Sequence, residues 1–204
     1  MIQMKRPLTW LGLLAATMLV LAACGPSPDD TAVGESAQGS GDGMIAPPPP
    51  GSGSGAAGLG WTAPSAWIEE APANPMRKAQ YRAGDDATCV VYYFGPGEGG
   101  DAQSNAARWA DQFEQPDGRP SREVMQFERI EVGGIPVILV EVTGTYTEGT
   151  MGGPARSRPD FMLLGAIAEG PDANWFFKFT GPESTLNREK DAFRAMVESL
   201  ERGS

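Results

Sequence analysis

The chain has 204 residues, of which 26 are acidic and 16 basic, so its formal net charge is −10. This charge disfavours nucleic acid as a partner, because affinity for the phosphate backbone comes largely from lysine and arginine. Histidine is absent, which excludes Ser-His-Asp and Cys-His catalytic sites and removes the commonest zinc ligand.

The N-terminal residues have the layout of a secretory signal. Lys5 and Arg6 precede an apolar run at residues 8–23, which ends in Leu-Ala-Ala-Cys at residues 21–24. The run is shorter than the roughly 20 residues that span a bilayer core. The whole resembles the lipobox of bacterial lipoproteins, which implies a signal peptide at residues 1–23, cleavage before Cys24 and diacylglycerol on the thiol of Cys24.

The resemblance also predicts where the protein lies. A lipid on Cys24 would anchor it to a membrane with the folded part facing the periplasm. Gly25 rather than aspartate follows Cys24, which resembles the outer-membrane class of lipoproteins, so in a cell with two membranes we expect the outer one. The lipid must hold the protein, since a chain this acidic is repelled by anionic lipid.

Composition divides the remainder into a tether and one domain. Residues 24–59 consist mostly of Gly, Pro, Ser and Ala, and such a segment buries too little apolar surface to offset the entropy of ordering it. Residues 60–202 are long enough to form one domain with a hydrophobic core.

The pattern of the domain is mostly strand. Val- and Tyr-rich or alternating segments predict strands at residues 61–68 (irregular), 76–83, 88–94, 123–132, 135–146, 161–169 and 174–180. Gly133 and Gly134 predict a hairpin turn, and residues 170–173 predict a second hairpin.

Two amphipathic segments predict helices. Apolar residues recur at helical spacing over 102–113 after Asp101, a suitable N-cap, and over 186–200 after Ser184 or Thr185. The strand from Phe161 is apolar on both alternating faces, so material covers both sides of the sheet. The expected fold is therefore α+β: a twisted, mostly antiparallel sheet of about six to seven strands flanked by two helices, an α/β/α sandwich.

This order of elements, with Trp61 and Trp67 at its start and a C-terminal amphipathic helix, resembles the PsbP-like fold. The segments Phe94-Gly95-Pro96-Gly97, Asn105 to Trp109 and Gly181-Pro182 are also similar to uncharacterised bacterial lipoproteins. The resemblance covers the folded domain and implies a non-catalytic accessory or binding module. It implies no functional residue.

Two groups of residues are candidates for binding. Asn105 and Arg108 lie beside Trp109 on the first helix, where they either receive a ligand or merely satisfy the preceding loop and cover the tryptophan. Arg156 and Arg158 lie in residues 147–160, a stretch without a predicted element. Such a stretch is typically either functional or disordered, and arginine binds carboxylates and phosphates well.

Two hypotheses of function follow. The first is a membrane-anchored envelope lipoprotein that acts as a non-catalytic binding or assembly module, with a protein or small-ligand partner and no cofactor. The alternative is an envelope hydrolase or a metal-dependent enzyme, which needs at least three carboxylate or amide groups converging in one pocket. Cys89 lies in an apolar run and is predicted to be buried rather than nucleophilic.

Overall fold

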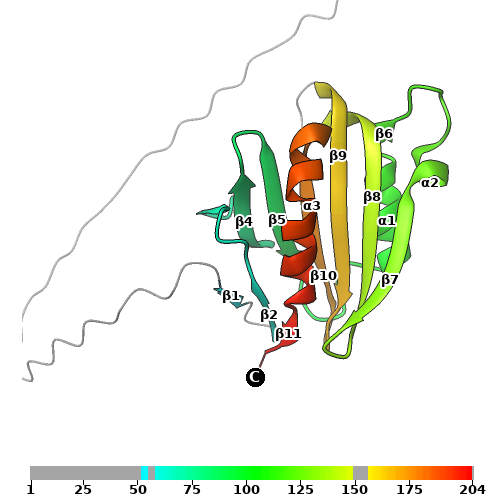
Figure 1. Ribbon diagram of the computed structural model, residues 1–204. Coiled ribbons are helices and arrows are strands. Elements are labelled where there is room, and N and C mark those ends of the chain that lie inside the picture. The colour runs from blue at the N-terminus through cyan, green and yellow to red at the C-terminus, as the bar shows by residue number, and fades with distance from the viewer. Residues whose placement is uncertain (1–51, 55–57, 149–155, 204) are drawn as a thin grey trace, which may run out of the picture. The chain divides into compact units, whose positions relative to one another are not determined.

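A large antiparallel sheet forms the centre of the domain, with a helix against each face (Figure 1). The structure is a computed structural model and describes residues 52–54, 58–148 and 156–203. Every strand pairing in it is antiparallel. The predicted α+β class is confirmed, and the described sheet has eight strands rather than six to seven.

The strand order of this sheet is β3-β4-β5-β10-β9-β8-β6, and β7 pairs with the same edge of β8 as β6 does. The eight strands are β3 (Ile68–Glu70), β4 (Arg77–Ala83), β5 (Ala87–Tyr93), β6 (Phe113–Glu114), β7 (Gln126–Val132), β8 (Ile135–Glu148), β9 (Arg156–Glu169) and β10 (Asn174–Pro182). The helices are α1 (Ala102–Ala110), α2 (Ser121–Val124) and α3 (Glu183–Glu198). A separate three-stranded sheet contains β1 (Ser52–Ser54), β2 (Leu59–Thr62) and β11 (Glu201–Arg202).

The predicted hairpin at Gly133 and Gly134 joins β7 to β8. Their φ angles are +55° and +76°, as a two-residue type I′ turn requires, and glycine adopts them without steric cost. The second predicted hairpin joins β9 to β10. Both hairpins are confirmed.

Strand β9 shows why both faces of the sheet are covered. Its alternate residues Met162 and Leu164 lie in the larger core cluster, with α3, whereas Leu163 and Ile167 lie in a second cluster, with α1. Each of these four side chains is at most 4% exposed. A strand apolar on both sides therefore lies in the middle layer, as predicted.

Helix α1 begins at the predicted cap. The Asp101 carboxylate accepts hydrogen bonds from the backbone N–H groups of Gln103 and Ser104, both at 3.0 Å. At the other end of the helix Trp109 packs so closely on Gly165 of β9 that a Cβ there would lie 2.4 Å from the indole. The helix thus lies against a strand position that only glycine can occupy.

Helix α3 begins differently from the prediction. Its N-cap is Pro182, without a side-chain hydrogen bond, so a cap at Ser184 or Thr185 is wrong. Pro182 ends β10, and the helix starts at the next residue. Thr185 lies within the helix, where it is buried and accepts a hydrogen bond from Arg188 at 3.0 Å. The strand and the helix follow one another with no loop to hold a capping residue.

The three-stranded sheet shows that the domain starts earlier than predicted. Leu59, which composition assigned to the tether, is 1% exposed in the larger core, and β1 pairs with β2 antiparallel. The predicted start of the domain at Gly60 falls inside β2, so the described domain includes at least Leu59 before it. Residues 1–23, Cys24 and the tether up to residue 51 lie outside the described residues.

The stretch 147–160 is also different from the prediction. Thr147 and Glu148 continue β8 and pair with Ser157 and Arg156 of β9. The pairing passes a register shift after Gly144, where φ is +143° and a Cβ would lie 2.6 Å from a backbone oxygen. The glycine allows this bulge. Most of the stretch that the sequence left without an element therefore belongs to β8 and β9, and residues 149–155 lie outside the described residues.

Candidate functional site

A groove lies between α3 and the strands β7, β8 and β9. Its volume is about 160 Å³. Its lining residues are Gln126, Phe127, Glu128, Leu139, Val140, Glu141, Leu164, Gly165, Lys190, Phe193 and Arg194.

The floor of the groove is apolar. Leu164 and Phe193 are each 4% exposed and belong to the larger core cluster, and Leu139 packs against that cluster while half-buried. The groove is therefore a place where the core reaches the surface between the helix and the sheet.

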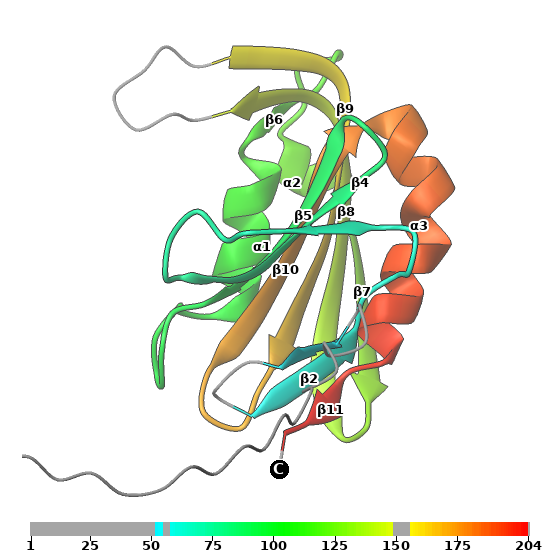
Figure 2. The same ribbon diagram turned by 90° about the vertical axis from the view of Figure 1, so that its left-hand side faces the viewer.

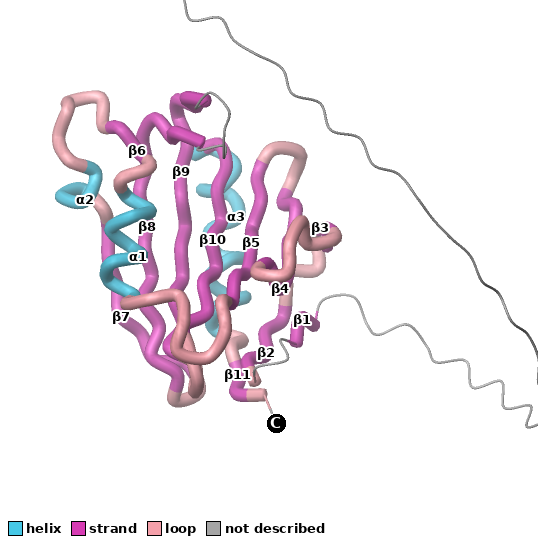
Figure 3. Tube along the Cα trace, turned by 180° about the vertical axis from the view of Figure 1, so that it is seen from behind, coloured by secondary structure: helices cyan, strands magenta, loops and turns pink. Residues whose placement is uncertain are grey.

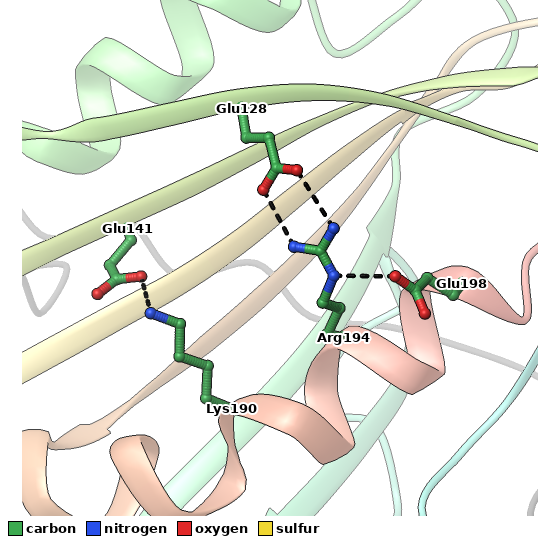
Figure 4. Close-up of polar contacts among 5 residues, drawn as sticks. All are labelled: Glu128, Glu141, Lys190, Arg194 and Glu198. Carbon is green, nitrogen blue, oxygen red and sulfur yellow. Dashed lines mark hydrogen bonds and ion pairs between the residues drawn. The ribbon is translucent and has the colours of Figure 1, made fainter.

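The rim of the groove is charged, and each charge has a partner (Figure 4). The guanidinium of Arg194 donates two hydrogen bonds to Glu128, at 3.0 and 3.2 Å, and a third to Glu198 at 2.9 Å. Lys190 donates to Glu141. Two bridges thus connect α3 with the facing strands across the groove.

The ion pair with Arg194 also determines the protonation of Glu128. The hydrogen bond from the guanidinium lowers the pKa of this carboxyl below its ordinary value, and burial opposes the shift only in part. Both side chains are about half exposed, where an ion pair contributes little to stability. Glu128 is therefore an ionised hydrogen-bond acceptor at neutral pH.

Local periodicity places these side chains on the faces that α3 and the strands turn toward each other. Lys190, Phe193 and Arg194 have i, i+3 and i+4 spacing and so share one face of α3. Glu128 faces them because alternate residues of β7 point toward the helix, and Glu141 lies opposite Gln126 in the register of β7 and β8. Sequence reasoning missed this groove, although a glutamate between Val140 and Val142 in an apolar strand was a usable signal.

The predicted residues Asn105 and Arg108 do lie together. Asn105 is 7% exposed and donates to the backbone oxygens of Gly99 and Asp101, at 2.8 and 2.9 Å. Its side-chain oxygen accepts a hydrogen bond from Arg108. Their contacts match the structural alternative, since the asparagine satisfies the loop that enters α1.

The predicted residues Arg156 and Arg158 lie on β9 rather than in a loop. Arg158 donates to Glu148 on β8, at 3.1 and 3.2 Å, and its guanidinium carbon lies 5.5 Å from the ring centroid of Phe161. Arg156 is exposed and pairs in register with Glu148. None of the four predicted residues lines the groove.

Other candidate chemistry is sparse in the part of the chain that the structure describes. Cys89 is fully buried, as predicted, and burial raises the pKa of its thiol. Within residues 52–54, 58–148 and 156–203 no three Cys, Asp or Glu side chains gather as a metal site would require. The same residues contain no helix that is both long and apolar enough to cross a membrane.

Comparisons with known proteins give similarity of fold only. No protein-family model and no curated protein matches the chain. The chain is similar to the solution structure of cyanobacterial PsbP (CyanoP) from Synechocystis sp. PCC 6803, with 13% identity, a TM-score of 0.46 and coverage of 71% of this chain and 86% of that one. It is also similar to the crystal structure of PA94, a protein of unknown function from Pseudomonas aeruginosa, with 15% identity, a TM-score of 0.37 and coverage of 66% and 80%.

Proposed function

We propose that this protein is a lipid-anchored, non-catalytic binding module that holds a protein partner at the groove along α3. The lipid is attached at Cys24, the domain faces the periplasm, and the outer membrane is the anchor where the cell has two membranes. The partner inserts one apolar side chain into the groove and places polar groups against the charged rim.

The size and lining of the groove carry this proposal. Its volume of about 160 Å³ is below the roughly 300–1,000 Å³ of pockets that enclose a whole small-molecule ligand. An apolar cavity of about 150 Å³ is enough for benzene, so the groove matches a single aromatic or aliphatic side chain. A small apolar pocket inside a polar rim is the usual anatomy of a protein contact.

The state of the carboxylates supports binding rather than acid–base catalysis. A general acid needs a raised pKa, whereas the pKa of Glu128 is lowered by the hydrogen bond from Arg194. Glu141 accepts a hydrogen bond from Lys190. The two carboxylates are thus engaged with cations of α3 and present hydrogen-bond acceptors to a partner.

Site-specific photo-crosslinking in the native cells tests the proposal. A photoreactive amino acid replaces Gln126, an exposed residue of the groove, in the full-length protein. The matched control carries it at Ile68, which is 52% exposed on β3 and does not line the groove. We expect one discrete crosslinked protein from position 126 and none from position 68.

A charge swap distinguishes loss of contact with the partner from loss of the folded structure. The double substitution Glu141→Lys with Lys190→Glu retains an ion pair across the groove but reverses the charges that a partner meets. We expect the crosslink to disappear while the free energy of unfolding changes by less than about 1 kcal/mol, because an ion pair is kept across the groove. A crosslink that survives the swap, or that position 68 also gives, contradicts the groove as the binding site.

A further inference from the structure

The face of the sheet that carries α1 is only partly covered. Figure 3 shows α1 over β8 and β9, with no helix over β10 and β5. Two half-buried cations lie on this face of the sheet, Lys178 on β10 and Arg77 on β4. The rings of Tyr92 and Tyr146 lie beside them.

Lys178 is half-buried near the centre of the sheet. Its ammonium donates to the side-chain oxygen of Gln112 at 2.6 Å and lies 5.6 Å from the ring centroid of Tyr146. Among the described residues no carboxylate lies within ion-pair distance of it. In the described part of the chain, its hydrogen-bond partner is a neutral amide.

Arg77 is in a similar position. Its guanidinium carbon lies 5.7 Å from the ring centroid of Tyr92, and Nη1 donates to Gln80 at 2.7 Å. Its Nε is buried and finds no acceptor in the described residues. A buried donor without an acceptor costs free energy, so this edge of the guanidinium is unsatisfied.

Strand register brings the two cations near each other. Gln80, which accepts a hydrogen bond from Arg77, and Lys178 both lie opposite Val90 of β5. The pKa of Lys178 is lowered to about 8, first by burial and then by the charge of Arg77. By contrast, Arg82 on the same strand as Arg77 is paired with Glu70 at 3.1 Å. A bound anion would offset the repulsion between the two cations.

We propose that Lys178 and Arg77 bind the oxyanion group, carboxylate or phosphate, of a small organic molecule whose apolar part contacts Tyr92 and Tyr146. Arginine offers a planar pair of donors to such groups, and lysine adds a compact charge. The aromatic rings favour an unsaturated or flat body next to the oxyanion. This site lies on the opposite side of the sheet from the α3 groove and is independent of it.

The hairpin formed by β8 and β9 lies along one side of the site. The described ends of β8 and β9 bend toward the side of the sheet where α1 lies (Figure 2). Tyr146 of β8 stacks on Phe161 of β9 with an interplanar angle of 5°, which holds its ring beside Lys178. The site therefore combines charge from β4 and β10 with an aromatic wall from β8.

Titrations of the purified full-length protein at pH 7, followed by amide NMR shifts, test the site. The probes are benzoate, phenyl phosphate and the neutral analogue benzyl alcohol. We expect saturable shifts around Lys178 with at least one of the two anions and none with the alcohol. The substitutions Lys178→Gln and Arg77→Gln should each weaken binding by about tenfold or more, as expected when a charge-assisted hydrogen bond is lost.

The matched control is Arg82→Gln, which removes a cation from the same strand that already has a carboxylate partner, and it should leave affinity unchanged. Because a substitution could disturb the fold, the wild-type protein provides a second measurement. Bound anion should raise the pKa of Lys178 toward its ordinary value of about 10.4. The proposal is overturned by equal weakening in Lys178→Gln and Arg82→Gln, by an unmoved pKa, or by no saturation with either anion up to about 10 mM.

Discussion

Gly165 determines how closely α1 approaches the sheet. A Cβ at this position would lie 2.4 and 2.8 Å from two carbons of the Trp109 indole, a large and nearly buried ring that cannot move aside. We expect Gly165→Ala to lower the free energy of unfolding by about 1–3 kcal/mol, the usual cost of overpacking, as measured by urea denaturation. Adding Trp109→Leu should recover part of the loss, and a neutral Gly165→Ala would mean that α1 does not pack here.

Lys178 links pH to stability. Its pKa of about 8 in the folded protein lies below the roughly 10.4 of an unfolded chain. Between these values the unfolded chain binds the proton and the folded protein does not, so stability increases as pH rises through this window. We expect the wild-type protein to gain stability from pH 8 to pH 10 relative to Lys178→Met, as followed by thermal unfolding.

The comparison with the variant is needed because three tyrosines act in the opposite direction. Burial raises the pKa of Tyr81 and Tyr93 to about 12 and also raises the pKa of Tyr146, so their folded forms keep protons that the unfolded chain loses above pH 10. The effect of Tyr81 and Tyr93 is common to both proteins and cancels in the difference, and the measurement stops at pH 10 because Tyr146 lies beside Lys178. A difference independent of pH would show that Lys178 is well solvated.

At the scale of elements, the three-stranded sheet is part of the larger core rather than an appendage of the tether. Leu59 of β2 is 1% exposed, and Trp61 of the same strand donates to the hydroxyl of Tyr81 at 3.0 Å and meets Phe177 edge-on. Strand β11, after α3, pairs with β2. The sheet therefore joins the N-terminal segment to the end of the chain.

Replacement of the Leu59 side chain tests whether β2 belongs to the core. We expect Leu59→Ala to lower the free energy of unfolding by about 2–5 kcal/mol, because it leaves a cavity in the core. The matched control Ile68→Ala removes an apolar side chain that is 52% exposed and should change stability by less than about 0.5 kcal/mol. Similar effects of the two substitutions in chemical denaturation would contradict the assignment of β2 to the core.

At the scale of the whole molecule, the proposed anchoring depends on one atom, the sulfur of Cys24. A hydroxyl does not replace the thiolate as the acylated nucleophile. We expect Cys24→Ser to accumulate as a longer precursor without lipid, measured by mass spectrometry and by partitioning into detergent. A variant that is processed and partitions like the wild type would contradict the lipoprotein proposal.

The amino-acid sequence by itself determined most of the secondary structure of the described domain. The diglycine turn, the cap at Asp101, the burial of Cys89 and the two-sided apolar pattern of β9 are local signals, because burial on one face leaves a period of two or 3.6 residues. Where the signal was composition alone, the prediction failed: Leu59 follows a Gly-rich run yet is core, and residues 147–148 and 156–160 continue β8 and β9.

Only the tertiary structure decided which charged residues meet. Glu128 and Arg194 lie across the groove because strand register and helix packing bring them together, and no periodicity encodes that pairing. Lys178, Arg77 and Tyr146 likewise come from three strands and converge on a face that α1 leaves uncovered. Periodicity reports whether a residue is buried, whereas a binding site depends on which distant residue lies beside it, and that is a property of the folded chain.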